Sequence, residues 1–303
     1  MLSINTNTAS MAAVNAINKS NASLSTSMER LATGNRINSS ADDAAGKQIA
    51  SRLTSQSDGM TVALRNIQDA TAMLQTADSM FDEMTDVLGR MKDLSTQAAN
   101  GTYSTDDLQA MQDEYDELGQ QMSDMLENTT YGGTNLFGNA SNSNTGTAGL
   151  FNGAVQFQVG AEASDTMKVD ISTQLSGLEG ALSDLSVSFD DDWTNGTPTA
   201  SGAGSELMTA SGATDTITAV QGAMDDVAAI QSKLGASINR LNDTAANLTS
   251  MQDNTEVAIG NIMDTDYATE ASNMTKQQVL MQTGITMLKQ SNSMSSMVSS
   301  LLQ

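Results

Sequence analysis

The sequence predicts a mainly α-helical fold: an elongated, discontinuous antiparallel helix bundle of the coiled-coil kind, with a small β-hairpin near its distal end. Three observations predict this class. Apolar residues recur at intervals of three and four towards both ends, a period of two is found only near the middle, and residues that break helices are rare. The 303 residues include one proline and 3% aromatics, so apolar content comes from aliphatic side chains and 21 methionines, which suits long, adaptable helices.

A first helix is predicted within residues 1–33. Its apolar residues form one stripe, which is enough to pack against one partner helix. The members of this stripe are Ile4, Met11, Val14, Ile17, Leu24, Met28 and Leu31. A structured connector is predicted at 34–43, because Gly34-Asn35 suits a helix C-cap, and the candidate N-caps for the next helix are Ser39, Ser40, Asp42 and Asp43.

Two more helices are predicted before the middle of the chain. Helical periodicity from about residue 43 to about residue 99 indicates a long helix, and the stretch "NGTYSTDD" at 100–107 ends it with a turn. Ser104 or Thr105 then suits the N-cap of a shorter helix that continues to about Met125.

The middle of the chain has a different composition. Residues 131–153 are rich in Gly, Asn, Ser and Thr, which favours loops. Two short alternating runs follow within 154–172, and their period of two predicts a β-hairpin. The runs are Val155, Phe157 and Val159, and Met167, Val169 and Ile171. Residues 173–213 are weakly patterned, so we expect a short variable segment there.

Helical periodicity returns between about 217 and 262, and a final helix is predicted at about 266–301. The two ends therefore mirror each other, so the simplest fold pairs the first helix with the last and the second with the penultimate. We expect a terminal helical domain of residues 1–33 and 267–303, a connector at 34–43, a rod domain of residues 44–175 and 214–266 that carries the hairpin, and a variable outer segment at 173–213.

The last helix carries two apolar stripes rather than one. The first consists of Met274, Met281, Ile285 and Leu288, and the second of Leu280, Met287, Met294, Val298 and Leu301. Burying one large apolar side chain is worth about 1.5–3 kcal/mol, so an uncovered stripe forfeits on the order of 10 kcal/mol. A two-helix hairpin covers only one stripe. The sequence therefore predicts that further copies of the chain cover the other.

Composition argues against catalysis, cofactors and metals. The chain has no histidine and no cysteine, which removes the commonest general base, thiol nucleophiles and the usual transition-metal ligands. We expect no enzyme activity, no cofactor, no membrane span and no cleaved signal at the start of the sequence. Residues 1–57 and 271–303 each have a net charge of +2. Because the whole chain has a net charge of −23, residues 58–270 must have a net charge of −27. This acidic middle argues against binding nucleic acid.

Two acidic groups have alternative interpretations. Asp190–Asp192, beside Trp193, could collect calcium, but such sites need further spaced oxygen ligands, and a solvated acidic loop is favoured. Asp264, Asp266 and Glu270 could be paired catalytic carboxylates. They are better explained as N-cap and first-turn acids of the last helix.

Several stretches resemble the conserved ends of bacterial flagellin. Near the start these are "SLSTSMERLATGNRINSSADDAAGKQIASRL" (23–53) and "LRNIQDATAMLQTADS" (64–79). Near the end they are "LGASINRLNDTAANL" (234–248), "DTDYATEASNMTKQQVLMQTGITMLKQSN" (264–292) and "VSSLLQ" (298–303), while "FQVGAEASDTMKVDI" (157–171) resembles the family's hairpin. The matches cover about two-thirds of the chain, in the order of the family.

This resemblance implies a structural subunit that polymerises with copies of itself into the extracellular flagellar filament used for motility. It also implies export in an unfolded form through the flagellar type III apparatus and assembly at the distal tip. The implied partners are the export chaperone, the filament cap and the hook–filament junction proteins. The terminal helices would form the inner layer of the filament.

Three further residues match positions through which the vertebrate Toll-like receptor that senses flagellin recognises the family. They are Arg90, Leu94 and Glu114, and "GRMKDLSTQAANGT" (89–102) resembles the surrounding stretch. The alternative is an ordinary helical surface, with Leu94 in the apolar stripe and Arg90 and Glu114 as surface charges.

Two rivals to a filament subunit fit parts of the pattern. The nearest is the hook–filament junction protein, a structural relative with similar ends. A helical signalling module, such as a receptor's cytoplasmic hairpin, predicts a tight turn at the distal end, and the long middle segment at 129–213 disfavours it.

Overall fold

A computed structural model describes residues 7–138, 149–183, 185 and 204–301, and these fall into two compact units. The terminal unit comprises residues 1–58 and 251–303, and the central unit comprises residues 59–250. Most of the described chain is helical, with two short antiparallel strand pairs, as the sequence predicts. The sequence instead predicts domain limits at the connector, residues 34–43, and near residue 266. Those limits stay a prediction.

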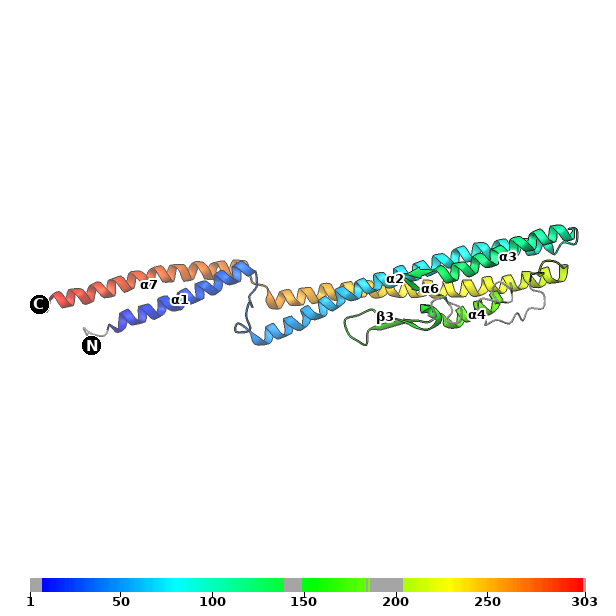
Figure 1. The fold of residues 1–303 in the computed structure, drawn as a ribbon. Coiled ribbons are helices and arrows are strands. Elements are labelled where there is room, and N and C mark those ends of the chain that lie inside the picture. The colour runs from blue at the N-terminus through cyan, green and yellow to red at the C-terminus, as the bar shows by residue number, and fades with distance from the viewer. Residues whose placement is uncertain (1–6, 139–148, 184, 186–203, 302–303) are drawn as a thin grey trace. The chain divides into compact units, whose positions relative to one another are not determined.

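The terminal unit is built on two helices from the two ends of the chain. Helix α1 (Thr8–Thr33) lies along α7 (Tyr267–Leu301) in antiparallel orientation, which confirms the predicted pairing of first and last helices (Figure 1). Helix α1 begins at the N-cap Asn7 and ends at Gly34, whose φ of 76° is the left-handed conformation that glycine adopts without steric cost. Gly34 is thus the predicted C-cap, and its N–H donates to the carbonyl of Arg30.

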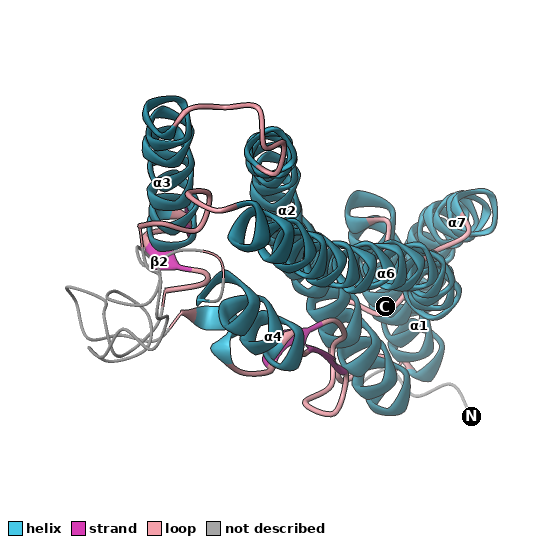
Figure 2. Ribbon diagram, turned by 90° about the vertical axis from the view of Figure 1, so that its right-hand side faces the viewer, coloured by secondary structure: helices cyan, strands magenta, loops and turns pink. Residues whose placement is uncertain are grey.

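The central unit is organised around three long helices, seen nearly end-on in Figure 2. They are α2 (Ala44–Ala98), α3 (Thr105–Asn128) and α6 (Ala210–Met263), close to the predicted ranges. Ser104 caps α3 in a capping box, in which its hydroxyl accepts the N–H of Asp107 and the Asp107 carboxylate accepts the N–H of Ser104. Lys92 and Gln231 bridge α2 and α6 through hydrogen bonds to Gln221 and Asp82.

Two short strand pairs lie in the middle of the chain. Strands β3 (Val155–Gln158) and β4 (Thr166–Val169) form the predicted hairpin, with Val155 opposite Val169 and Phe157 opposite Met167. Strands β1 (Thr130–Tyr131) and β2 (Thr134–Asn135) form a smaller pair that the sequence pattern does not reveal.

The structure adds a helix that the sequence does not predict. Helix α4 (Ser172–Ser183) occupies the start of the weakly patterned segment that was expected to be variable, and Leu175, Leu178 and Leu182 on one of its faces are buried in the central core. Another unpredicted feature lies beside the 3₁₀ helix η1 (Leu150–Asn152), where the rings of Phe137 and Phe151 stack at 5.5 Å inside the core. Asp190–Asp192 and Trp193 lie outside the described residues.

Candidate functional site

The contact between α1 and α7 is narrow and lined by alternating large and small side chains. On α1, Leu24 and Ser27 are buried, while Ile17 and Leu31 are half-buried. Most of the other half-buried positions of α1 are small residues, namely Ser10, Ala13, Ser20, Ser23 and Thr26, and Arg30 lies near the end of the helix. Small side chains at every second position let the two backbones approach closely, so the contact buries little apolar surface.

The matching face of α7 contains three of the predicted apolar residues. Met274, Met281 and Leu288 are half-buried there, at seven-residue intervals. Gly284 lies between them, and a Cβ atom placed on it would be 2.8 Å from Cγ1 of Ile17. Gly284 therefore marks a point of close approach between the two helices.

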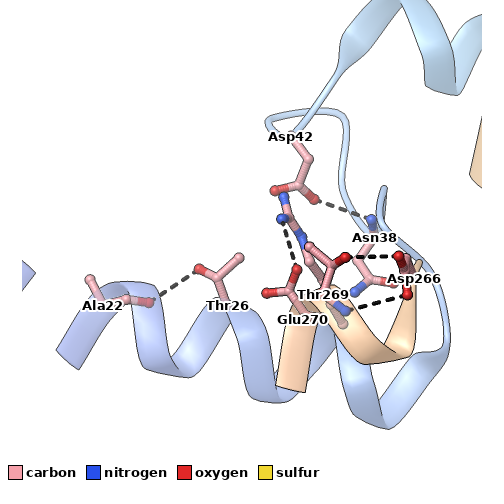
Figure 3. Close-up of polar contacts among 8 residues, drawn as sticks. Ala22, Thr26, Asn38, Asp42, Asp266, Thr269 and Glu270 are labelled. Atoms are coloured by element: carbon pink, nitrogen blue, oxygen red, sulfur yellow. Dashed lines mark hydrogen bonds and ion pairs between the residues drawn. The ribbon is translucent and has the colours of Figure 1, made fainter. Parts of the chain in front are cut away.

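Polar contacts hold the pair at both ends. Near the chain termini, the Asn7 amide donates to the hydroxyl of Ser291 at 3.1 Å. At the opposite end Arg30 forms an ion pair with Glu270, with 3.9 Å between Nη1 and Oε2 (Figure 3). Glu270 is 7% exposed, and the Arg30 Nε is buried without a hydrogen-bond partner. The ion pair therefore neutralises a carboxylate that would be costly to bury alone.

The same end of the terminal unit contains the connector. Arg36 donates its backbone N–H to the carbonyl of Met263 and its guanidinium to that of Ile262. Asp266 caps α7 by accepting hydrogen bonds from the backbone N–H groups of Ala268 and Thr269. The hydrogen bonds from Thr269, drawn in Figure 3, lower the pKa of Asp266. This confirms the interpretation of Asp266 as an N-cap acid, with Glu270 in the first turn.

The outward faces of α1 and α7 are apolar and exposed. Exposure reaches 59% at Met11, 64% at Met287 and 58% at Met294. The predicted polymerisation residues on these exposed faces are Met11, Val14, Met28, Leu280, Ile285, Met287 and Met294. Val279 and Met297 add to the exposed apolar surface of α7. A single folded copy therefore leaves much of its terminal apolar surface in water.

The terminal unit has almost no core of its own. Among its described residues only six are buried, and they include two serines and a glutamate. The full set is Leu24, Ser27, Ile37, Ala50, Ser57 and Glu270. In contrast, the central unit has a continuous core of leucine, methionine, valine and phenylalanine side chains. We infer that an isolated terminal unit is marginally stable.

Two details of the predicted stripes differ in the structure. On α1 the apolar residues do not form one stripe: Ile17, Leu24 and Leu31 face α7, whereas Met11, Val14 and Met28 are exposed. The reason is that Ala13 and Ser27 occupy the contact. Successive residues of a helix point about 100° apart, so Val14 and Met28, each one residue further on, face away from α7.

On α7, Ile285 is exposed rather than aligned with Met274, Met281 and Leu288. Ile4 lies outside the described residues, and so do the side chains of Val298 and Leu301, although both residues belong to α7.

The structure brings together two of the three residues matched to receptor recognition. Arg90 on α2 donates to Oε1 of Glu114 on α3 from Nε at 2.8 Å, and the two side chains are 53% and 46% exposed. Leu94 is only 3% exposed and belongs to the core. Of these three residues, only the Arg90–Glu114 ion pair is exposed to solvent, and Leu94 packs in the core on the inner side of α2.

A buried polar cluster in the central unit was not apparent from the sequence. The Gln112 amide donates to Asp116 at 2.9 Å and to Glu206 at 2.6 Å, and its oxygen accepts the backbone N–H of Leu207. Burial raises the pKa values of Asp116 and Tyr115, and the nearby charge of Glu206 raises them further. This cluster anchors the segment before α6 to α3, so its role is structural.

Within the described part of the chain, no three acidic, cysteine or histidine side chains lie close enough together to hold a metal ion. In the same residues, no helix has both the length and the apolar character needed to span a membrane.

Comparison with known proteins identifies the family. Residues 4–142 match the "Bacterial flagellin N-terminal helical region" and residues 217–302 match the "Bacterial flagellin C-terminal helical region", so the two matches together span most of the chain. The chain belongs to the bacterial flagellin family. Flagellin A of Vibrio cholerae serotype O1 is 31% identical and Flagellin A of Vibrio anguillarum 30% identical, each over 100% of both chains.

A solved structure shares the fold. A putative flagellar hook-associated protein from Vibrio parahaemolyticus is 16% identical, with a TM-score of 0.53 over 74% of this flagellin and 100% of that chain. Membership of the family makes the present flagellin a non-enzymatic structural subunit of the extracellular flagellar filament, which serves motility. The resemblance stated from sequence is confirmed.

Proposed function

We propose that this flagellin polymerises through the exposed apolar faces of α1 and α7, which neighbouring copies cover. The supporting observation is the pairing itself: α1 and α7 already cover each other along one face, yet large side chains such as Met287 and Met294 stay in water. No second segment of the described chain covers these faces. A neighbour that presents the same two helices supplies a matching apolar surface.

Covering these exposed faces supplies part of the free energy of assembly. The seven exposed polymerisation residues are each about half exposed, so covering each is worth about 1 kcal/mol, or roughly 5–10 kcal/mol for each copy. Association itself costs about 4–15 kcal/mol in lost freedom, which is of the same size as this gain. In a filament, each copy gains this contribution while contacting several neighbours.

The test replaces exposed methionines on α7 by charged residues. Met287→Asp combined with Met294→Asp places carboxylates on the proposed contact, whereas Leu150→Asp, at a 39% exposed apolar residue of the central unit, is the matched control. Purified monomers are induced to polymerise and observed by electron microscopy. The double variant should stay monomeric and the control should form filaments; filaments from the double variant would refute the proposal.

We further propose export of the unfolded chain and assembly of the arriving subunits at the distal tip, beneath the cap. Two properties support export: the terminal unit buries few residues, and the chain has no cysteine that could lock a fold before export. The exposed faces of α7 suit the export chaperone, which would cover them before assembly. Met287→Asp with Met294→Asp should then weaken binding of α7 to the chaperone in a pull-down, while Leu150→Asp should leave it unchanged.

The alternative function is that of a hook–filament junction protein. The likeness to a putative hook-associated protein at 16% identity concerns the fold alone. The two functions predict different products when depolymerised protein reassembles. A filament subunit extends into long filaments, whereas a junction protein stops at short rings.

We also propose that the surface around the Arg90–Glu114 ion pair is recognised by the vertebrate Toll-like receptor that senses flagellin. Both side chains are about half exposed, and buried Leu94 supports the helix beneath them. Arg90→Glu reverses the charge of the pair, and Arg65→Glu makes the same change at another exposed arginine of α2. In a receptor reporter assay only Arg90→Glu should reduce the response; an unchanged response would remove this proposal.

A further inference from the structure

Methionines are distributed unequally between the two units. In the terminal unit none of the described methionines is buried, and six are exposed: Met11, Met28, Met251, Met287, Met294 and Met297. In the central unit no described methionine is exposed, and most belong to the core. The buried ones are Met60, Met73, Met80, Met84, Met91, Met111, Met122 and Met167.

Small oxidants in solution therefore reach the exposed methionines of the terminal unit more readily than the buried methionines of the central unit. The chain has no cysteine, so its thioethers are its only sulfur groups and the main targets of a hydroperoxide. In the reaction the sulfur attacks the peroxide O–O bond and gains one oxygen, so that methionine is oxidised by two electrons to the sulfoxide while hydrogen peroxide is reduced to water. Exposure governs which sulfurs react.

We propose that the outward faces of α1 and α7 form an oxidation site, at which hydroperoxides convert Met11, Met28, Met287, Met294 and Met297 of the free subunit to sulfoxides and thereby block assembly. This proposal rests on the proposed function, because it needs the same faces to be covered by neighbours. A sulfoxide oxygen is a strong hydrogen-bond acceptor. When a neighbouring copy covers it, the oxygen loses its hydrogen bonds to water, which costs free energy and weakens the contact.

The central unit keeps its fold under the same treatment. Its buried sulfurs, such as those of Met84 and Met91, are fully shielded by the surrounding core. Oxidation therefore changes the contact surface without unfolding the central unit. The block is reversible, because a methionine sulfoxide reductase returns the thioether and releases the oxygen as water, while a dithiol supplies the two electrons and becomes a disulfide.

The experiment treats full-length monomer with hydrogen peroxide, maps sulfoxides by peptide mass spectrometry, and measures the critical concentration for assembly by sedimentation. The control variant combines Met11→Leu, Met28→Leu, Met287→Leu, Met294→Leu and Met297→Leu, since leucine is similar in volume and is not oxidised. Peroxide should raise the critical concentration of the parent by about tenfold or more, because several uncompensated polar groups enter the contact. It should leave the leucine variant within about twofold, and reductase should restore the parent.

The outcomes separate this proposal from the proposed function. Equal oxidation of both units in the peptide map, or unchanged assembly of a subunit fully oxidised at these five positions, overturns the oxidation site while the filament function stands. Failure of the untreated parent and of the leucine variant to assemble overturns the proposed polymerisation surface instead. Selective oxidation of the terminal unit with loss of assembly, reversed by reductase, supports the proposal.

Discussion

Replacing Gly284 with alanine tests whether α1 and α7 pack as closely as the structure indicates. The added Cβ would lie 2.8 Å from Cγ1 of Ile17, nearer than van der Waals contact allows, and Cγ1 is close to the backbone end of that side chain. Ile17 must therefore change rotamer or the helices must separate. Gly235 on α6 provides the control, because a Cβ at that position would meet no atom within 4 Å.

The two effects of the substitution have opposite signs. Alanine is favoured over glycine inside a helix by about 0.8–1.0 kcal/mol, whereas overpacking a close contact costs about 1–3 kcal/mol. Gly284→Ala should therefore destabilise the terminal unit by about 1 kcal/mol net. Gly235→Ala should stabilise the central unit by about 1 kcal/mol, since only the propensity gain applies. When Ile17 is also replaced by alanine, the clash disappears and Gly284→Ala should become stabilising.

Circular dichroism of the monomer during heating measures these changes. We expect the helices of the terminal unit to unfold in an earlier transition than the central unit, because so few of their side chains are buried. Gly284→Ala should lower the midpoint of the first transition and leave the second unchanged. If Gly284→Ala raises that midpoint in the presence of Ile17, the close approach of α1 and α7 is refuted.

Three further predictions concern polar groups. Ser104→Ala removes the cap of α3 and should destabilise the central unit by about 1 kcal/mol in urea unfolding. Glu270→Gln leaves Arg30 without its ionic partner and should lower the stability of the terminal unit by about 1–2 kcal/mol, seen in the first thermal transition. Burial raises the pKa of Asp116, so the folded central unit binds a proton at this carboxyl more tightly than the unfolded chain does. The stability that this proton contributes is fully present below the ordinary aspartate pKa and is lost as the pH rises through the raised pKa. Asp116→Asn should therefore stabilise the central unit at pH 7, where the carboxylate is charged, and this gain should fade in unfolding measured at pH 4 and below.

Much of the helical architecture was predictable because local chemistry determines it. Gly34 and Ser104 mark helix boundaries through backbone conformation and capping, which depend on a few neighbouring residues. The long helices extend over many turns, so their periodicity is clear. The β3–β4 hairpin was predictable for the same reason, because Phe157 and Met167 alternate with polar neighbours.

The features that were missed depend on contacts between distant residues. Helix α4 is short and contains Gly177 and Gly180, so its propensity is low, and the buried face through Leu178 is stabilised by the core rather than by local sequence. Phe137 lies within a stretch whose composition favours loops, yet its ring packs edge-on against Phe81 at 5.1 Å. Composition cannot reveal such a pairing.

The exposed apolar surface of the terminal helices was predictable in outline but not in detail, while its role in polymerisation stays a prediction. The exposed residues of α7 include several from the predicted second stripe, such as Met287 and Met294. The split of the α1 stripe was not predictable from apolar spacing, because the contact with α7 is centred on small side chains such as Ala13 and Ser27. Predictions from sequence patterns rely on the spacing of large apolar residues, whereas the distance between two closely packed helices depends on the small residues at their contact.

Truncation tests the central claim most directly, that the two terminal helices drive polymerisation. A chain restricted to residues 34–266 lacks α1 and α7 and retains the entire core of the central unit. Sedimentation under conditions in which the parent forms filaments should find this chain monomeric at every concentration, with its helical circular dichroism signal and the thermal transition of the central unit retained. Filaments in the pellet from the truncated chain would contradict the account.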